Sequence, residues 1–444
     1  MRIAVVGSGI AGNTAAWALT QPMGADDATT RNTEVVMYER RTRTGGHSCT
    51  VTVDYEGEAI PVDIGFIVYN TLNYPNLVAL FDHLDVETIK SDMSFGVSMA
   101  EGGLEWSGKT LDTVFAQKRN IASPRFLMML RDIFRFNKQA PEDLASGSLF
   151  GKSLGAYLSE LRVSRAFVDF YLAPMGAAIW STPHADVLDF PAESFVRFFN
   201  NHRLLHRERP KWRTVKSGSR SYVDKITAPF RENIRLGCAV KAVERRGPKV
   251  CVTDETGHED LFDHVIFASH TDQTLAAIKD PSEQERSVLG AIRYRPNTVY
   301  LHRDDQLMPR RRKVWSAWNY IETPHATQKE TGVCVSYWMN ALQKIRHDKP
   351  VFVSLNPATP PRDDLIFHEA TFDHPQFDAG ALHAQRALET IQGQNRLWFC
   401  GAWCGYGFHE DGLSAGLDVA ERLGGRVPWR EPHTNSVPQL EAAE

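Results

Sequence analysis

A glycine motif near the N-terminus has the spacing that dinucleotide binding requires. A short apolar run is followed by Gly7, Gly9 and Gly12, and small residues then continue into a predicted helix. The first glycine allows a tight turn, the second lets backbone amides approach a pyrophosphate, and the third lets the helix pack closely on the strand. The start of that helix, including Ile10 and Ala11, would present unpaired N–H groups and a partial positive charge to the phosphates.

An acidic residue ends the next predicted strand. Glu39 closes the apolar run 34–39 and would accept hydrogen bonds from a pair of ribose hydroxyls. It lies 27 residues after Gly12, whereas the usual spacing is about 20. We interpret the polar run 24–33 as a loop inserted between helix and strand. A glycine-rich turn without a ligand is the alternative, but strand, helix and acid together favour a nucleotide.

A basic loop with paired glycines follows Glu39. It contains Arg40, Gly45, Gly46 and His47. Paired glycines indicate that the backbone passes close to another group, here the far side of the same cofactor.

Length and composition are those of an ordinary globular enzyme. The chain has 444 residues, of which 42% are hydrophobic and 23% charged, with a formal net charge of −4. Two intertwined domains are expected from this length, and the charge gives no reason to expect a nucleic-acid partner. Six cysteines without disulfide-framework spacing favour a reducing compartment. Because a strand starts at Arg2 and no apolar run approaches about 20 residues, we expect no signal peptide, no membrane span and a cytoplasmic location.

Two segments in the middle of the chain are candidates for substrate contact. Residues 171–180, which end in Trp180, are apolar and small, and suit a buried turn or a tunnel wall. The run 197–213, which ends in Arg213, carries six Arg or Lys against one acid and would hold a carboxylate or phosphate headgroup at a pocket mouth. A solvated basic surface would have the same composition.

Aromatic residues gather in the strand-like region 290–340. Trp315 and Trp318 are candidates for lining a substrate cavity, although an apolar sheet core would show the same pattern. His202 and His206 stand four apart, as zinc ligands on a helix do, but no carboxylate motif accompanies them, so we expect no metal.

A basic amphipathic helix is predicted over residues 123–137. Its apolar positions 126, 127, 130, 133 and 134 recur on one helical face, and arginines flank that face. Such a helix either covers a core or lies on a membrane surface, so peripheral membrane contact stays open.

The order of these motifs resembles the FAD-dependent amine oxidase and desaturase superfamily, which includes monoamine oxidases, phytoene desaturases, protoporphyrinogen oxidases and flavin-dependent fatty-acid isomerases. Three blocks carry the resemblance: residues 3–66, 234–269 and 396–423. It implies an α/β fold in which a Rossmann-type FAD-binding domain is interleaved with an α+β substrate domain of mixed sheet and helices. It also implies a cofactor contact at Val240.

The resemblance divides the chain into discontinuous parts. The implied FAD-binding domain comprises residues 1–70, 215–285 and 390–425. The implied substrate domain comprises residues 71–214 and 286–389, and residues 426–444 form a C-terminal tail.

The third block also places a helix start near the C-terminus. A short apolar strand is broken by Gly401, and Asp411, as N-cap, begins a predicted helix with Gly412 and Leu413. Its N-terminus would stabilise negative charge on the pyrimidine end of a reduced flavin. A plain surface helix is the alternative.

Candidate catalytic residues lie just before this helix. His409, Glu410 and Tyr406 could serve in proton transfer or in positioning the substrate, and Trp403 could contact the substrate. His409 could equally be a packed histidine. A Cys400 and Cys404 redox pair is disfavoured because their spacing is not Cys-x-x-Cys.

Departures from the superfamily shape the expected chemistry. The segment 367–380 lacks the cysteine that carries covalent flavin in some members, so we expect dissociable, non-covalent FAD. His47 replaces the arginine common in the glycine loop. These departures weaken the case for an amine substrate. The apolar and aromatic middle segments and the basic run 197–213 favour an oxidoreductase that abstracts hydride at carbon from a hydrophobic, lipid-like or fatty-acyl substrate, by desaturation, oxidation or double-bond isomerisation. The alternatives are a peroxide-producing amine or amino-acid oxidase, and a non-catalytic flavin-binding partner protein. The oligomeric state is left open.

Overall fold

A computed structural model describes residues 1–21, 33–180, 184–208, 210–322 and 334–431. The polar run that we interpret as an inserted loop lies almost wholly outside the described residues, as does most of the C-terminal tail. None of the helices in the described ranges is both long and apolar enough to span a membrane.

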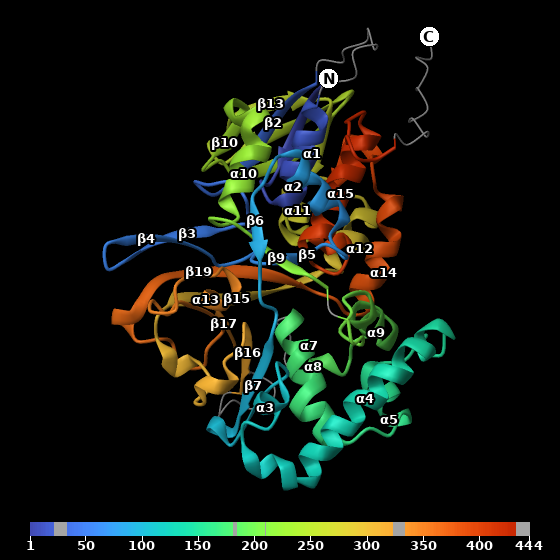
Figure 1. Ribbon diagram of the computed structural model, residues 1–444. Coiled ribbons are helices and arrows are strands. Elements are labelled where there is room, and N and C mark those ends of the chain that lie inside the picture. Colours follow the sequence, from blue (N-terminus) through green and yellow to red (C-terminus); the bar gives the residue numbers. More distant parts are fainter. Residues whose placement is uncertain (22–32, 181–183, 209, 323–333, 432–444) are drawn as a thin grey trace.

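A parallel five-stranded sheet forms the upper part of the molecule in Figure 1. Its strand order is β10 (Ile234–Leu236), β2 (Glu34–Glu39), β1 (Arg2–Val6), β14 (His264–Phe267), β20 (Leu397–Phe399). Every neighbouring pair is parallel. These strands read as continuous apolar runs because both faces of a parallel sheet are covered.

Alternate side chains of the sheet enter two different cores. Ile3 and Val5 pack with helices α1 (Ile10–Thr20), α10 (Arg220–Thr227) and α15 (His409–Arg422). Ala4 and Val36 face the opposite core, with the antiparallel sheet of β11 (Val240–Arg246), β12 (Lys249–Asp254) and β13 (Glu259–Phe262) and with helices α12 (Glu283–Gly290) and α14 (Ala379–Ala387). Because successive side chains of a strand point to opposite faces, one face of the sheet is covered by helices and the other by the antiparallel sheet with its two helices.

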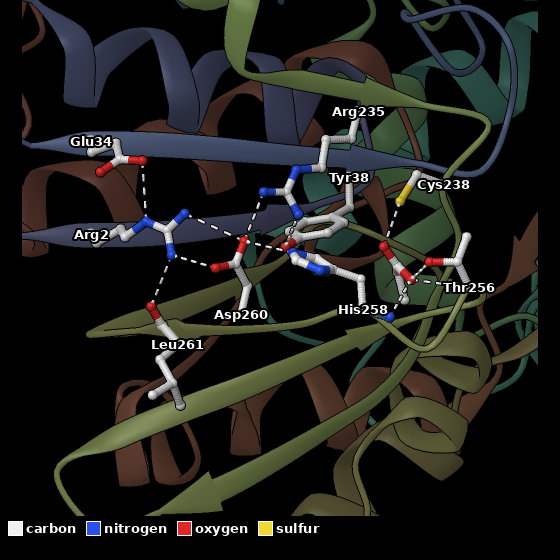
Figure 2. Close-up of polar contacts among 10 residues, drawn as sticks. Arg2, Glu34, Tyr38, Arg235, Cys238, Thr256, His258, Asp260 and Leu261 are labelled. Atoms are coloured by element: carbon white, nitrogen blue, oxygen red, sulfur yellow. Dashed lines mark hydrogen bonds and ion pairs between the residues drawn. The ribbon is translucent and has the colours of Figure 1, made fainter.

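An ion-paired cluster ties the small antiparallel sheet to the parallel one (Figure 2). Asp260 of β13 lies 2.7 Å from the guanidinium groups of both Arg2 and Arg235. Burial alone would raise the pKa of Asp260, but the hydrogen bonds from the two arginines outweigh it and hold the pKa at about 2. Close by, Cys238 donates to Asp254, which fixes the start of β11.

A seven-stranded sheet forms the other half of the molecule. Its order is β19 (Ile366–Gln376), β15 (Arg293–His302), β18 (Phe352–Leu355), β17 (Cys334–Trp338), β16 (Trp318–Ile321), β7 (Phe95–Met99), β8 (Leu104–Ser107). Only the β16 and β7 pair is parallel. The hairpin of β3 (Thr50–Tyr55) and β4 (Glu58–Asp63) packs on one face of this sheet, over β15, β18 and β19. Helices α4 (Pro124–Ala145), α5 (Leu154–Glu160), α7 (Ala173–Trp180) and α9 (Ala192–Asn201) pack on the same face farther along, over β17, β16, β7 and β8.

A small sheet lies between the two large ones in Figure 1. It consists of β5 (Tyr69–Asn70), β9 (Trp212–Val215) and β6 (Thr88–Lys90), and both of its pairings are antiparallel. The remaining helices are α2 (Pro75–His83), α3 (Leu111–Val114), α6 (Arg165–Phe167), α8 (His184–Val187), α11 (Thr271–Ala277) and α13 (Met339–Leu342).

The expected α/β fold with a Rossmann-type part and an interleaved mixed-sheet part is confirmed. All five parallel strands come from the three segments that the sequence assigns to cofactor binding, and all seven strands of the mixed sheet come from the two substrate segments. The boundaries between the two parts stay a prediction.

Two local expectations are corrected. The segment ending in Trp180 is helical rather than a turn, because α7 runs to that residue. Helix α4 buries a stripe different from the expected one: Phe126 is buried as expected, whereas Leu127 and Phe134 are exposed. Successive apolar pairs along the helix cannot all share one face of about 100°, so one member of each pair turns outward.

Candidate active site

The N-terminal glycines form a tight strand-to-helix turn. Gly7 has φ +102°, a conformation that side chains other than glycine rarely adopt, and Gly9 is the N-cap of α1. A Cβ at Gly12 would overlap the carbonyl oxygen of Gly7, so this glycine sets how closely helix and strand pack. A Cβ at Gly9 would meet nothing within 4 Å and would project into open space. The turn therefore leaves room for a ligand at Gly9.

The carboxylate of Glu39 is held beside this turn. One oxygen accepts from both the amide and the hydroxyl of Ser8, at 3.0 and 2.5 Å, and the other accepts from the Arg41 amide at 2.8 Å. Because a carboxylate oxygen has two acceptor positions, the second oxygen of Glu39 keeps one position for a ribose hydroxyl.

The glycine loop after β2 closes against the first turn. The amide of Gly45 donates to the carbonyl of Ser8 at 2.9 Å, and a Cβ at Gly46 would lie 2.9 Å from Cα of Gly9. The loop thus packs on the first glycine turn.

A second helix start comes next to the first. A Cβ at Gly416 would overlap the carbonyl oxygen of Ala11, and one at Gly412 would lie 2.9 Å from a methyl carbon of Ile10. Helices α15 and α1 therefore touch along their small residues, which brings their N-termini together. Two partial positive charges then face the same region.

The start of α15 differs from the expectation in one respect. The helix begins at His409, with Phe408 as its N-cap, so Asp411 occupies the third helical position and is not the cap residue. One carboxylate oxygen of Asp411 accepts from the amides of Tyr406 and Phe408, at 3.1 and 2.8 Å. Burial raises the pKa of Asp411 to about 6.

One cavity of about 1540 Å³ joins the glycine turn to the mixed sheet. At the nucleotide end it is lined by most of the expected cofactor residues. These are Gly7, Gly9, Ile10, Ala11, Glu39, Arg40, Gly46, His47, Val240 and Gly401. Farther along it is lined by six expected substrate or catalytic residues: Trp180, Arg213, Trp318, Trp403, Tyr406 and His409. The cavity thus gathers residues from the whole length of the chain.

Some expected site residues lie outside the cavity wall. Gly12, Gly45, Gly412 and Leu413 pack the turn and the two helices, and Asp411 ties the start of α15. Glu410 accepts from the amides of Asn76 and Leu77 and so caps helix α2. Trp315 packs with Met308 and Phe352, and its indole N–H donates to the Pro309 carbonyl. These residues shape the site without facing it.

His409 belongs to a buried polar cluster at the cavity wall. Its Nε2 lies 2.6 Å from the hydroxyl of Tyr222, which lies 2.5 Å from the hydroxyl of Ser48. The imidazole also stacks on Phe66 with ring centroids 3.8 Å apart. Burial lowers the pKa of His409 to about 3, so the ring is neutral at pH 7 and cannot act there as an acid.

Three further histidines converge on the cavity. The ring of His47 lies 5.5 Å from that of His374 and 6.5 Å from that of His270. Burial, and for His47 the neighbouring histidines, lower all three pKa values, that of His374 to about 4. Nε2 of His47 and Nδ1 of His270 are buried without a hydrogen-bond partner, as are the indole N–H groups of Trp318 and Trp403. These four polar groups have hydrogen-bonding capacity that the described residues do not use.

Sequence reasoning missed several of these residues. His374 and Phe372 lie on β19 and line the cavity, but the residues around them in the sequence form no recognisable binding motif. Tyr222 looks in the sequence like any other tyrosine of a core. His270 carried a usable signal, since it follows a predicted parallel strand and ligands bind at the carboxyl ends of such strands.

Basic side chains stand where the cavity meets solvent. Lys90, Lys211 and Lys344 line the cavity and are exposed. Arg213, in register with Lys90, also lines it, and its guanidinium donates to the hydroxyl and carbonyl of Thr88. The cavity mouth is therefore positive.

The two histidines considered as metal ligands and the two cysteines considered as a redox pair have other surroundings. His202 stacks on Phe198, and Nε2 of His206 lies 2.8 Å from the Asn200 side chain. Within the described ranges, no three His, Cys, Asp or Glu side chains are grouped to hold a metal. Burial raises the pKa of Cys400 to about 12 and that of Cys404 well above its ordinary value, which keeps both thiols protonated.

Comparisons with known proteins agree with this geometry. Residues 5–84 match the family model of an NAD(P)-binding Rossmann-like domain. No curated protein sequence matches the chain. Among solved structures, a CLA-producing fatty acid isomerase from P. acnes superposes with a TM-score of 0.66 at 13% identity, covering 95% of this chain and 98% of that one.

Two amine oxidases are comparably similar. Putrescine oxidase bound to putrescine gives a TM-score of 0.65 at 15% identity, covering 96% of this chain and 100% of that one. Cyclohexylamine oxidase from Brevibacterium oxydans gives 0.64 at 13% identity, covering 95% and 99%. Residues 5–84 thus match an NAD(P)-binding Rossmann-like domain, and the chain shares its fold, over nearly its whole length, with this fatty acid isomerase and these two amine oxidases.

Proposed function

We propose that the protein is an oxidoreductase that holds FAD non-covalently and removes hydride from a carbon of a long, apolar substrate carrying an anionic headgroup. The observation that carries this proposal is the single cavity that runs from Gly9 to an aromatic chamber with basic residues at its mouth. Its volume exceeds that of a typical small-ligand pocket, which is about 300–1,000 Å³. Cofactor and substrate would share it.

The residues present fit a flavin dinucleotide. Gly9 leaves open space at the helix N-terminus, Glu39 keeps acceptor capacity for a ribose, and the paired starts of α1 and α15 favour negative charge. The unpaired ring nitrogens of His47 and His270 offer hydrogen bonds along the wall. When bound, FAD supplies a two-electron acceptor for hydride.

The chamber beyond the nucleotide end would bind the substrate chain and exclude water. Its wall includes apolar and aromatic side chains from α7, α9 and the mixed sheet: Tyr171, Met175, Ile179, Trp180, Phe198, Trp318, Tyr337 and Phe377. Hydride removal leaves an electron-poor carbon, and a dry chamber protects it from attack by water. Neutral His409 adds no positive charge to the cavity wall.

The basic mouth favours an acyl carboxylate over a cationic amine. Lys90, Lys211, Arg213 and Lys344 would attract a carboxylate or phosphate and repel an ammonium group. An amine substrate is the second candidate, because two of the similar structures are amine oxidases and because Tyr406 and Phe408 line the cavity as an aromatic pair.

Anaerobic reduction of the flavin tests this proposal. Purified protein reconstituted with FAD is mixed, in the absence of oxygen, with long-chain acyl lipids and separately with mono- and diamines. Bleaching of the visible flavin band by acyl lipids, or a shifted or removed double bond in the recovered lipid, supports the proposal. Bleaching by amines with peroxide formation in air supports the amine alternative, and stable FAD binding with neither reaction supports a non-catalytic flavin-binding protein.

A further inference from the structure

Large apolar side chains that face solvent are concentrated in one part of the chain. Of the nine exposed large hydrophobic residues in the described ranges, six lie between residues 111 and 150: Leu111, Ile121, Leu127, Met128, Phe134 and Phe150. Phe134 is 76% exposed. Clustered exposed apolar side chains indicate an interaction surface, whereas single ones need no explanation.

Helix α4 is apolar on two opposite sides. Its inner side packs Phe126, Met129, Phe136 and Ala140 into the core. Leu127, Arg131, Phe134 and Lys138 follow one another at helical spacing on the other side, flanked by Met128 and Arg135. We refer to these six residues as the α4 outer face. Its apolar members contribute nothing to the core.

The α4 outer face is strongly basic. Residues 118–138 contain six Lys or Arg and a single acid, Asp132. The side chain of Asp132 is fully buried, where it accepts from the amide of Ser164 at 2.7 Å and pairs with Arg131 at 2.8 Å. Solvent therefore meets cations and apolar side chains on this face, the combination that lies in the headgroup region of an anionic membrane.

We propose that the α4 outer face docks on the surface of an anionic lipid membrane. In Figure 1 helix α4 lies at the lower end of the molecule, with the parallel sheet at the opposite end. Docking there leaves the nucleotide end directed away from the membrane. Phe134 and Leu127 enter the boundary between headgroups and acyl chains, and Arg135 and Lys138 contact lipid phosphates.

The same helix reaches the cavity wall on its inner side. Phe126 packs edge-on against Trp106 with ring centroids 6.4 Å apart, and Trp106 and its neighbour Tyr171 line the cavity. Gly108 and Lys109 line the cavity and are exposed, and Leu111, which is exposed, follows them two residues later. The cavity thus reaches solvent close in the chain to Leu111, one of the exposed apolar residues. The inference extends the proposed function by naming the source of the substrate, but its test needs no turnover.

Vesicle flotation tests the apolar part of the surface. The intact protein is floated with vesicles of phosphatidylcholine and phosphatidylglycerol, and with pure phosphatidylcholine. The double variant Leu127→Ser/Phe134→Ser is compared with Leu261→Ser, which removes an apolar side chain 49% exposed on β13, in the other half of the molecule. We expect the native protein and the Leu261 variant to float with anionic vesicles, and the double variant to bind at least about tenfold more weakly.

Two results of the flotation overturn the proposal. One is native protein that stays with the soluble fraction for both vesicle types. The other is a double variant that floats like the native protein. Matching far-UV circular dichroism and thermal unfolding of the three proteins verify that each is folded, which is expected because the substituted side chains are exposed.

A charge-reversed variant tests the electrostatic part. Arg135→Glu/Lys138→Glu should abolish flotation with anionic vesicles, and about 0.5 M salt should weaken flotation of the native protein. Equal binding of the native protein to neutral and anionic vesicles overturns the anionic part of the proposal. Sedimentation analysis tests whether a second copy of the chain covers this face instead of lipid. A native dimer that Leu127→Ser/Phe134→Ser converts to monomer would show that it does, and would overturn the proposal.

Discussion

The ring nitrogen Nε2 of His409 lies 2.6 Å from the hydroxyl of Tyr222, although the two residues are 187 positions apart in the chain. Ser48 completes the group, with its hydroxyl 2.5 Å from that of Tyr222. The start of α15, helix α10 and the end of the glycine loop therefore meet in one buried hydrogen-bonded cluster beside the cavity.

Removing the Tyr222 hydroxyl should destabilise the protein. Tyr222→Phe removes both short contacts of the cluster and leaves only the 3.3 Å contact between the Ser48 hydroxyl and Nε2 of His409. We expect the free energy of unfolding to fall by about 1–3 kcal/mol because buried polar groups lose a partner. Ser48→Ala leaves the contact between Tyr222 and His409 intact and should cost less. Denaturant unfolding of both variants measures the order, and a larger loss for Ser48→Ala would be inconsistent with Tyr222 as the centre.

Filling the contact between α1 and α15 should weaken both stability and flavin affinity. A methyl group at Gly416 overlaps the Ala11 carbonyl, so Gly416→Ala pushes the helices apart, and we expect a loss of about 1–3 kcal/mol in the free energy of unfolding. Flavin fluorescence should report weaker FAD binding as the two helix starts separate. Gly290→Ala is the control, because its Cβ meets only a Leu275 methyl at 3.7 Å. Unchanged stability of Gly416→Ala would show that the helices do not pack in this way.

The charge at the cavity mouth should be felt by an anionic substrate. Lys211→Gln removes an exposed cation from the wall, and we expect the apparent dissociation constant for a fatty acid to rise about two- to fivefold, the effect of one exposed charge pair. The methyl ester of the same acid should bind equally to both proteins. Lys216→Gln, which removes a lysine paired with Glu87 outside the cavity wall, is the control. Equal weakening of acid and ester would assign Lys211 a structural role.

Burial of His302 should make the protein less stable in mild acid. Its Nδ1 accepts from the Asp304 amide and its Nε2 lies 2.8 Å from the Ser354 hydroxyl. Burial lowers its pKa from 6.5 to about 4, so between these values the unfolded chain binds a proton that the folded chain does not. Stability contributed by this site is therefore complete above about pH 6.5 and is lost as the pH falls towards 4.

A histidine variant isolates that contribution. His302→Asn should lose stability between pH 6.5 and 4 less steeply than the native protein, by up to about 1.4 kcal/mol per pH unit. Buried Asp63 and Asp411, with pKa values raised to about 6, act in the opposite sense in both proteins and cancel in the comparison. Identical slopes for His302→Asn and native protein would refute the assignment.

The sequence predicted the nucleotide end well because glycine spacing and strand ends are local features. The strand 34–39 could be read from its apolar run and its terminal acid, and the turn at Gly7 from glycines at fixed spacing. The roles of Gly412 and Leu413 could not, because whether a glycine meets a ligand or another helix depends on a partner almost 400 residues away. Tertiary contacts bring together His270, His374 and the Tyr222 cluster. Such contacts produce no periodic pattern in the sequence.

Binding of FAD by the Gly9→Val variant tests the central claim most directly. The claim is that the open space at Gly9, where two helix starts meet, holds the pyrophosphate of one FAD per chain. The Cβ of a valine there would enter that space and meet nothing within 4 Å. Apoprotein of the native sequence should bind one equivalent of FAD in a calorimetric titration, while Gly9→Val should unfold at the native temperature and stay colourless. A Gly9→Val protein that binds FAD as tightly as the native one would contradict the claim.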